Sequence, residues 1–316
     1  MKQLPYNDYG SAMRRKFGGR VQKLAIDAGL SCPNRDGTIS YGGCTFCLGE
    51  AFRPSYCRNS NEVTRQIDSA LRFHNARGRK AEHYLAYFQS GTNTHSDINT
   101  LRKIYNEAIS HPAISGIIIG TRPDCINTEI LQLFNDIAHR TYIAVEYGIE
   151  SVYDATLHHV NRGHDFATAL RAIAETKALG IDVGAHFILG LPNESREDIV
   201  AGIDLINPIN IDFIKFHQLQ IYTSTTMERE WREHPERFLF GGNFDTKDYI
   251  ALVIEIIRHL NPNIAIERIV SQAPHHLIAH SPLGGMRPQE IRDAVINDMI
   301  INSYRQGDLA ATHGLK

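Results

Sequence analysis

The sequence predicts an α/β protein built as a partial (β/α)6 barrel of the TIM type, followed by a C-terminal extension. Apolar runs of strand length alternate with amphipathic stretches of helix length, an order typical of parallel strands with right-handed crossovers. The 316 residues, of which 42% are hydrophobic, are enough to bury one large core. A doubly wound open sheet is the competing arrangement for the same alternation.

Six strands and five helices are expected in order along the chain. The strands are predicted at Val21–Asp27, Tyr84–Gln89, Ile114–Gly120, Tyr142–Ile149, Ile181–Leu189 and Ile211–Leu219. The helices between them are predicted at Glu62–Arg77, Asp97–His111, Glu129–His139, Phe166–Leu179 and Ser195–Ile206. Asn127 and Ser195 are typical residues for the start of a helix. The alternation ends near Thr226, so we expect a barrel over residues 1–225 and an extension packed on it over residues 226–316.

The alternation of side chains along the last three strands predicts which residues enter the barrel. In this register Glu146, Glu150, His186, Lys215 and His217 face one interior, opposite the apolar side chains of the same strands. So many buried ionisable groups are costly unless they pair or bind a polar ligand. A Glu–Lys–His network that closes the barrel is one interpretation, and a ligand-lined cavity is the one we favour. On the second interpretation, Glu146, Lys215 and His217 are candidate catalytic residues.

Three cysteines, Cys32, Cys44 and Cys47, lie in one glycine-rich loop directly after the first predicted strand. Structural zinc takes four ligands, and iron–sulfur clusters normally take four thiolates. Three thiolates therefore leave one iron open to another ligand, which indicates a reactive centre. Cys57 could complete a zinc site, but zinc sites usually contain two close cysteine pairs, and here only Cys44 and Cys47 form one.

Unusual motifs also follow the C-terminal ends of the next four predicted strands. They are QSGTNT (Gln89–Thr94), GTRPDC (Gly120–Cys125), GIES (Gly148–Ser151) and GLPNES (Gly190–Ser195). In parallel barrels this end carries the active site, so we expect the motifs to join the cysteine loop in one site. Cys125 either faces that site as a candidate catalytic thiol that donates a hydrogen atom, or is a small buried hydrophobic residue.

A segment of the extension, ERIVSQAP (Glu267–Pro274), places Arg268 and Ser271 in an otherwise apolar context. These two residues either close the bottom of the cavity or touch the substrate.

The overall composition excludes several classes of partner. The net charge of −2 gives no global positive field for nucleic acid, although Arg14–Lys16 with Arg20 and Arg77–Lys80 form local basic clusters. The longest apolar runs are too short to cross a bilayer, so no membrane partner is expected. No apolar segment typical of a secretory signal is visible, and five mostly clustered cysteines favour a reducing compartment. We therefore expect a cytoplasmic protein.

Taken together, the motifs resemble those of the radical S-adenosylmethionine (SAM) enzymes, and within them the YhcC-like branch related to the Elongator catalytic subunit and oxygen-independent coproporphyrinogen oxidase. The spacing C-x11-C-x2-C is similar to the long first gap of the Elongator and YhcC-like groups. QSGTNT departs from the superfamily's GGE-type motif, which puts side-chain contacts to the SAM amino group in doubt. The resemblance covers most of the chain and rests on TRPDC (Thr121–Cys125), VEYGIES (Val145–Ser151), NRGH (Asn161–His164) and FILGLPNES (Phe187–Ser195).

The resemblance implies a cofactor set and a mechanism. Cys32, Cys44 and Cys47 would hold three irons of a [4Fe–4S] cluster, and SAM would chelate the fourth through its amino and carboxylate groups. Reduction of the cluster would cleave SAM to methionine and a 5′-deoxyadenosyl radical, which would abstract hydrogen from the substrate. By matching positions, Phe46 would contact the adenine of SAM, and Ser90 and Gly91 would contact its amino group. Arg162 would bind the carboxylate, and Glu150 and His186 would contact the ribose or methionyl part. Further contacts to SAM would come from Thr121, Gly148 and Gly190.

The resemblance to the Elongator subunit also implies a substrate and a partner. It suggests modification of a tRNA nucleoside, of the wobble-uridine type, with electrons from a donor such as flavodoxin or ferredoxin. The same machinery acting on a small metabolite is the first alternative. A non-catalytic iron–sulfur or zinc protein that senses redox state or binds a partner is the second.

Overall fold

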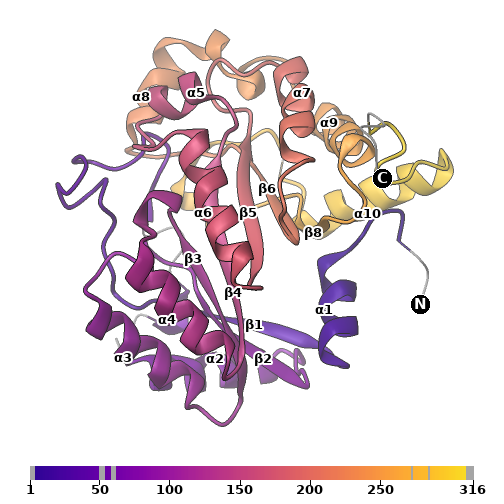
Figure 1. Cartoon of the computed structure of the whole chain (residues 1–316). Helices are drawn as coiled ribbons and strands as arrows, with labels where there is room; N and C mark the ends of the chain where they lie inside the picture. The colour runs from indigo at the N-terminus through magenta and orange to yellow at the C-terminus, as the bar shows by residue number, and fades with distance from the viewer. Residues whose placement is uncertain (1–3, 50–53, 58–61, 272, 284, 311–316) are drawn as a thin grey trace.

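The structure is a computed structural model that describes residues 4–49, 54–57, 62–271, 273–283 and 285–310. Seven parallel strands form one curled sheet in the order β1-β2-β3-β4-β5-β6-β8 (Figure 1). The strands are β1 (Val21–Ile26), β2 (His83–Phe88), β3 (Ile114–Thr121), β4 (Tyr142–Glu150), β5 (Asp182–Leu189), β6 (Phe213–Gln218) and β8 (Ala265–Arg268). Two short strands, β7 (Ile221–Tyr222) and β9 (Ile278–His280), pair antiparallel in a separate sheet.

The helices that follow the strands cover the outer face of the curled sheet (Figure 1). The α-helices are α1 (Tyr9–Phe17), α2 (Val63–Asn75), α3 (Ile98–Ile109), α4 (Thr128–Ala138), α5 (Asp154–His159), α6 (Phe166–Ala178), α7 (Arg196–Ile206), α8 (Thr226–Glu233), α9 (Thr246–His259) and α10 (Pro288–Ile301). Short 3₁₀ turns lie at Ser55–Cys57, Pro123–Cys125, Pro235–Arg237, Leu239–Gly241 and His275–Leu277. In the described ranges, no helix has the length and apolar character needed to span a bilayer.

The six predicted strands and five predicted helices are confirmed, with ends that differ by at most two residues. The sheet order follows the chain without a reversal, whereas a doubly wound sheet has a point where the order reverses. The fold is therefore the curled half-barrel. Strand β8 was not predicted, because it has only four residues and lies in the extension. The extension thus adds a strand to the sheet, and the domain boundary at residue 225 stays a prediction.

The predicted alternation of faces is confirmed on β4, β5 and β6. Val145, Val183 and Ile214 lie in the large core between the sheet and the outer helices. A second, smaller apolar cluster fills the inside of the barrel, and it includes Ala144 and Phe213 from the opposite faces of β4 and β6. A slip of one residue would exchange these two sets, so the cores fix the register of the strands.

Helix α1 closes the N-terminal end of the barrel. Asp8 caps the helix, and the Tyr9 ring packs 4.8 Å from the Phe213 ring in the inner cluster. Lys16, at the other end of α1, forms an ion pair with Asp182 at the start of β5. The basic cluster Arg14–Lys16 therefore lies at the N-terminal ends of the strands. The cluster Arg77–Lys80 precedes β2 and lies at that end too.

We expect Gly184→Ala to destabilise the fold, because a Cβ at this position would overlap the ring of Phe213 on the neighbouring strand. Overpacking of this kind typically costs about 1 to 3 kcal/mol. Urea unfolding followed by circular dichroism measures the effect. Gly49→Ala is the matched control, since the nearest atom lies 3.6 Å from the added Cβ. Equal unfolding midpoints for the two variants would show that the interior is loosely packed.

Candidate active site

The loop after β1 brings three free thiols together at the C-terminal side of the sheet. Cys44 is buried, and Cys32 and Cys47 are half-buried. The backbone N–H of Cys47 donates to the carbonyl of Cys44 at 3.0 Å, and the Arg35 guanidinium donates to the carbonyl of Cys47 at 2.7 Å. Burial lowers the pKa of Arg35, but the charges of Cys47, Cys32 and Cys44 together raise it. All three thiols therefore act on one guanidinium.

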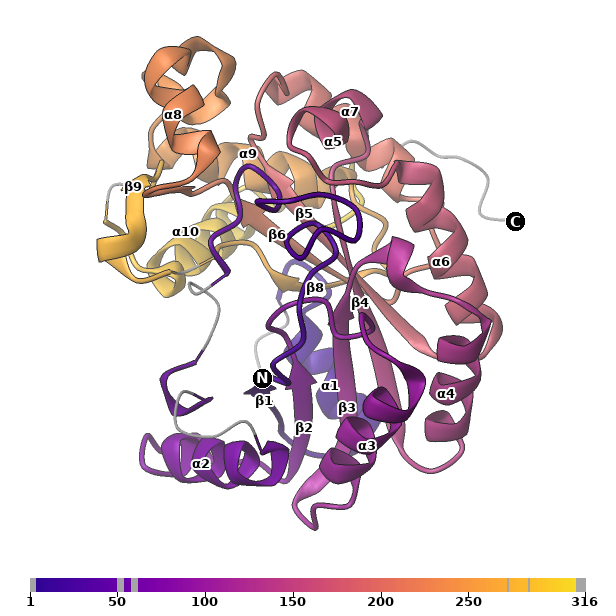
Figure 2. The same ribbon diagram turned by 90° about the vertical axis from the view of Figure 1, so that its left-hand side faces the viewer.

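Other elements hold this loop in place. The N–H of Thr45 donates to the carbonyl of Val160, and the N–H of Met227 on α8 donates to the carbonyl of Thr45 at 3.1 Å. The side-chain amide of Asn161 donates to the carbonyl of Gly43 at 2.9 Å. In Figure 2 the violet loop accordingly runs from β1 up towards α8. The loop conformation is thus supported by the segment after β4 and by the extension.

Arg162 lies between the cysteine loop and the end of β4. Its Nη1 donates to Cys44 Sγ at 3.7 Å, its Nη2 donates to the carbonyl of Gly148 at 2.5 Å, and the Glu150 carboxylate lies 3.6 Å away. The side-chain amide of Asn34 also donates to Cys44 Sγ, at 3.6 Å. A positive charge and two N–H donors therefore lie directly beside Cys44 Sγ. The Nε of Arg162 is buried and has no partner in the described part of the chain.

The loops after β2 and β3 add further polar atoms without partners. Among the described residues, Ser90 Oγ and Arg122 Nη1 are buried and form no hydrogen bond. Gly91 has a φ of 75°, and a Cβ there would overlap the carbonyl of Leu30 in the cysteine loop. Thr121 is less available, because its hydroxyl lies 2.6 Å from the Thr94 hydroxyl and both side chains are buried.

Two further glycines also allow close backbone packing. A Cβ at Gly148 would lie 2.8 Å from Arg162 Nη2, and Gly190, with a φ of 83°, packs against the ring of Phe240. Phe46 is half-buried and packs against the large core. Free thiols, a cationic side chain at Cys44 and unpartnered donors around them suit an iron–sulfur cluster that carries an anionic ligand. The residues present therefore fit the implied cofactors.

A single-ion metal site needs its ligands to converge on one point. Across the described residues, no three His, Cys, Asp or Glu side chains lie close enough to hold a single ion. Thiolates that bind three different irons of a cluster need not converge on one point. Cys57 is fully buried, and its thiol donates to the carbonyl of Ala25 on β1 at 3.5 Å. Cys57 is thus a buried thiol, which agrees with the weak zinc spacing.

Cys125 is half-buried at the end of the turn after β3. Burial raises the pKa of its thiol to about 12, and the charges of Asp124 and Cys32 act in the same direction. The thiol therefore stays protonated at neutral pH and lies on the Cys32 side of the site.

The interior of the barrel holds an ion network centred on Glu146. Its fully buried carboxylate accepts from Lys23 at 2.7 Å, from Lys215 at 2.5 Å and from the Tyr87 hydroxyl at 2.6 Å. His186 Nε2 lies 2.8 Å from the same carboxylate. Burial alone would raise the pKa of Glu146, but the charges of Lys215 and Lys23 hold it well below its usual range. Glu146 is thus ionised at neutral pH.

The same network joins the two edges of the sheet. Lys23 on β1 lies 2.5 Å from Glu267 on β8, and Glu267 also lies 3.2 Å from Lys215. β1 and β8 are the first and last strands of the sheet and are not paired by backbone hydrogen bonds. A Glu–Lys–His network that closes the barrel is therefore present, and it includes the candidate catalytic residues Glu146 and Lys215. Their catalytic role stays a prediction.

His217, the other interior candidate, is not used by this network. Its ring centroid lies 5.4 Å from that of His186, and its Nε2 is buried without a hydrogen bond to any described residue. Burial and the charge of Arg268 hold its pKa well below the usual range, so the imidazole is neutral. His186 Nε2 lies within hydrogen-bond distance of Glu146, so only the other atoms of the imidazole ring could make the predicted contact with SAM.

Three members of the network were missed from the sequence. Lys23 and Tyr87 alternate with the apolar residues Leu24 and Phe88 on β1 and β2, so the rule that found Glu146 could have found them. Glu267 could not be placed, since β8 was not predicted.

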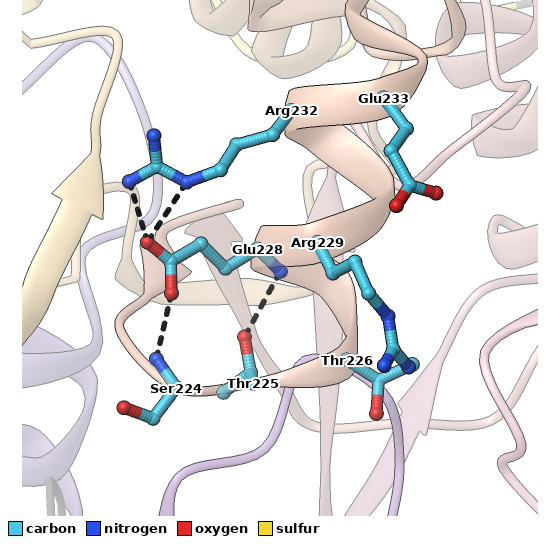
Figure 3. Close-up of a pocket in the computed structure, with 7 residues that line it drawn as sticks. All are labelled: Ser224, Thr225, Thr226, Glu228, Arg229, Arg232 and Glu233. Carbon is cyan, nitrogen blue, oxygen red and sulfur yellow. Dashed lines mark hydrogen bonds and ion pairs between the residues drawn. The ribbon is translucent and has the colours of Figure 1, made fainter.

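A separate pocket of about 430 Å³ lies outside the barrel, at the start of α8 (Figure 3). It is lined by Ser224, Thr225, Thr226, Glu228, Arg229, Arg232 and Glu233. Glu228 accepts from the N–H of Ser224 at 2.7 Å and from Arg232 at 2.7 Å, while Thr225 caps the helix. Side chains of the same segment thus already accept from the N–H groups at the start of α8. We therefore propose no ligand for this pocket.

We expect Glu146→Gln to destabilise the fold by about 3 to 5 kcal/mol, because it leaves Lys215 and Lys23 with too little negative charge in the interior. Urea unfolding measures the change. Asp136→Asn removes a surface carboxylate that lies 3.4 Å from Arg102, and it should change stability by far less. A Glu146 variant as stable as this control would show that the network does not hold the barrel together.

Comparisons with known proteins agree with this geometry. The family model described as "Radical SAM superfamily" matches residues 35–206, and the "Radical_SAM C-terminal domain" model matches residues 211–299. Protein YhcC from Escherichia coli (strain K12) is 35% identical over 268 residues, which are 84% of this chain and 84% of that protein. Elongator complex protein 3 from Mus musculus is 26% identical over 206 residues, 63% of this chain and 36% of that protein.

A solved structure shares the fold. The archaeal Methanocaldococcus infernus Elp3 with a deletion of N-terminal residues 1–46 aligns with a TM-score of 0.68 at 15% identity, over 90% of this chain and 64% of that chain. Radical SAM enzymes use SAM and a [4Fe–4S] cluster, and the chain matches their family over more than half its length. The chain therefore belongs to the radical SAM superfamily and, within it, to the group of proteins related to YhcC.

Proposed function

We propose that this radical SAM enzyme abstracts a hydrogen atom from a tRNA nucleoside of the wobble-uridine type. The observation that carries the enzymatic part is the set of three free thiols beside Arg162, with unpartnered donors around them. The similarity to Elongator complex protein 3, in sequence and in fold, supports the RNA part.

In this proposal the loops at the C-terminal side of the sheet bind either the cluster or SAM. Cys32, Cys44 and Cys47 bind the [4Fe–4S] cluster, which together with SAM supplies a carbon radical when both are bound. Arg162 orients the SAM carboxylate through its unpartnered Nε, while its other nitrogens stay on Cys44 and Gly148. The remaining contacts to SAM come from Phe46, Ser90, Gly91, Thr121, Glu150, His186 and Gly190.

The interior residues act on the substrate side of the site. Cys125 keeps its proton at neutral pH, so its S–H bond can give a hydrogen atom to a substrate radical. The thiyl radical left on Sγ then takes one electron from the electron donor and a proton from solvent. Glu146 and Lys215 fix the position of His186, and His217 presents an unpartnered nitrogen. Closed packing by α1 at the other end of the barrel keeps water from entering there.

A one-electron donor such as flavodoxin or ferredoxin completes the system. Cys32, Cys44, Cys47 and Cys125 form no disulfide with any residue that the structure describes, which suits the reducing cytoplasm that we propose as the compartment. The basic clusters Arg14–Lys16 and Arg77–Lys80 lie at the end of the barrel opposite the cysteine loop. They are therefore poor candidates for tRNA contacts at the site.

We expect alanine at Cys32, Cys44 or Cys47 to abolish cluster formation in the anaerobically reconstituted protein, because each thiolate holds a different iron. Iron and sulfide content and the visible absorption spectrum measure the loss. Cys57→Ala is the matched control and should keep the cluster, since Cys57 lies in the core. Loss of the cluster in Cys57→Ala alone, or full retention in one of the other three, would contradict the assignment.

We expect a tRNA pool to accelerate formation of 5′-deoxyadenosine by the reduced, reconstituted enzyme, because a bound substrate positions the hydrogen that the radical removes. Mass spectrometry of the reaction quantifies the product. Heat-denatured tRNA and a low-molecular-weight cell extract serve as comparisons. Stimulation by the small-molecule extract and not by tRNA would reject the RNA substrate in favour of a small metabolite.

A further inference from the structure

The pairing between β6 and β8 turns Arg268 into the barrel. Ile214 pairs with Ile266, and the register then shifts so that Lys215 pairs with Arg268. Residues paired across parallel strands lie on the same face of the sheet. Lys215 faces the interior, where it binds Glu146, so Arg268 faces the interior as well.

Among the residues that the structure describes, Arg268 has no counter-ion there. It is half-buried, yet its side chain forms no ion pair or hydrogen bond with any residue that the structure describes. The carboxylates of Glu146 and Glu267 are already shared between Lys23 and Lys215. Two carboxylates balance two lysines, and Arg268 adds a further positive charge. A partly buried guanidinium without an anion is costly, which indicates that a bound anion completes this region.

His217 supplies a polar nitrogen on the same face that also has no partner among the described residues. His217 lies two residues after Lys215 on β6, on the same face as Arg268, and its Nε2 is buried without a partner in the described part of the chain. Burial and the charge of Arg268 both lower the pKa of His217. His217 pairs with Ile188 on β5, two residues before Gly190. His217 thus lies closer than Lys215 and Arg268 to the end of the barrel that carries the cysteine loop.

We propose that Arg268 and His217 bind an anionic group of the substrate, a carboxylate or a phosphate, inside the barrel. A guanidinium holds either group through two parallel N–H donors, and His217 Nε2 adds a third polar contact. The inference deepens the proposed function and rests on it in one respect, because it takes the barrel interior to be the substrate side of the radical SAM site. A phosphate flanking a nucleoside and the acidic group of a metabolite share this chemistry.

Isothermal titration of the full-length, anaerobically reconstituted protein with inorganic phosphate and with acetate, at constant ionic strength, tests the proposal. We expect saturable binding of at least one anion, weakened about tenfold or more in Arg268→Gln, because charge-assisted hydrogen bonds are lost. Arg268→Lys keeps the positive charge but loses the two parallel N–H donors of the guanidinium, so it should bind the anion with intermediate affinity. Arg258→Gln is the matched control, since Arg258 is paired with Asp308 at the surface, and it should bind like the parent protein.

The two probes distinguish the sources of the anion. Tighter binding of phosphate indicates a nucleotide or phosphorylated substrate, and tighter binding of acetate indicates a carboxylic acid. No saturable binding of either probe, or equal binding by the parent protein and a folded Arg268→Gln, would overturn the proposal. If Arg268→Gln does not fold by circular dichroism, unchanged affinity in Arg268→Lys overturns it instead. Neither SAM cleavage nor RNA is measured, so failure of the tRNA proposal leaves this result interpretable.

Discussion

The ion pairs of the buried Glu146 carboxylate with Lys23 and Lys215 hold the two edges of the half-barrel together. A half-barrel leaves its first and last strands without backbone pairing, so another contact must hold the two edges at the right distance. Here Lys23 on β1 binds both Glu146 and Glu267, and Lys215 binds the same two carboxylates from β6. Coulombic attraction across the interior replaces the hydrogen-bond ladder that a closed barrel would have. The curvature of the sheet, and with it the position of the loops at its C-terminal side, follows from this network.

The network also divides the interior into two regions with different chemistry. On the side of α1, aromatic rings surround the Lys23 ammonium, with the Tyr9 centroid 4.4 Å away, and the inner apolar cluster packs beside them. On the other side lie groups without partners among the described residues, His217 and Arg162 Nε, near free thiols. Native proteins rarely leave buried polar atoms unsatisfied, so these two groups support the proposed position of the cofactors and substrate. The interior beside α1 stabilises the fold. We propose that the interior on the side of the cysteine loop binds the cofactors and the substrate.

Much of this arrangement could be predicted from local sequence. Alternation along β4 to β6 assigned Glu146, His186 and Lys215 to the interior, because a register slip would have buried polar residues among the helices. Whether these groups pair with one another or with a ligand was beyond the sequence, since the answer depends on Lys23 and Glu267, which are far apart in the chain. The four-residue strand β8 is too short for periodicity to reveal. Helix α1 was missed because its apolar residues are few and its role is to plug a barrel end that only the fold creates.

In the proposed site, three thiolates leave one iron open beside Arg162, and SAM binds that iron. The most direct measurement is electron–nuclear double resonance spectroscopy of the reduced, reconstituted protein with SAM isotopically labelled at the amino nitrogen or the carboxylate oxygens. We expect hyperfine coupling from both labels to the cluster, because both groups would bind the same iron. A reduced cluster that shows no coupling to either label, although SAM is bound, would contradict it.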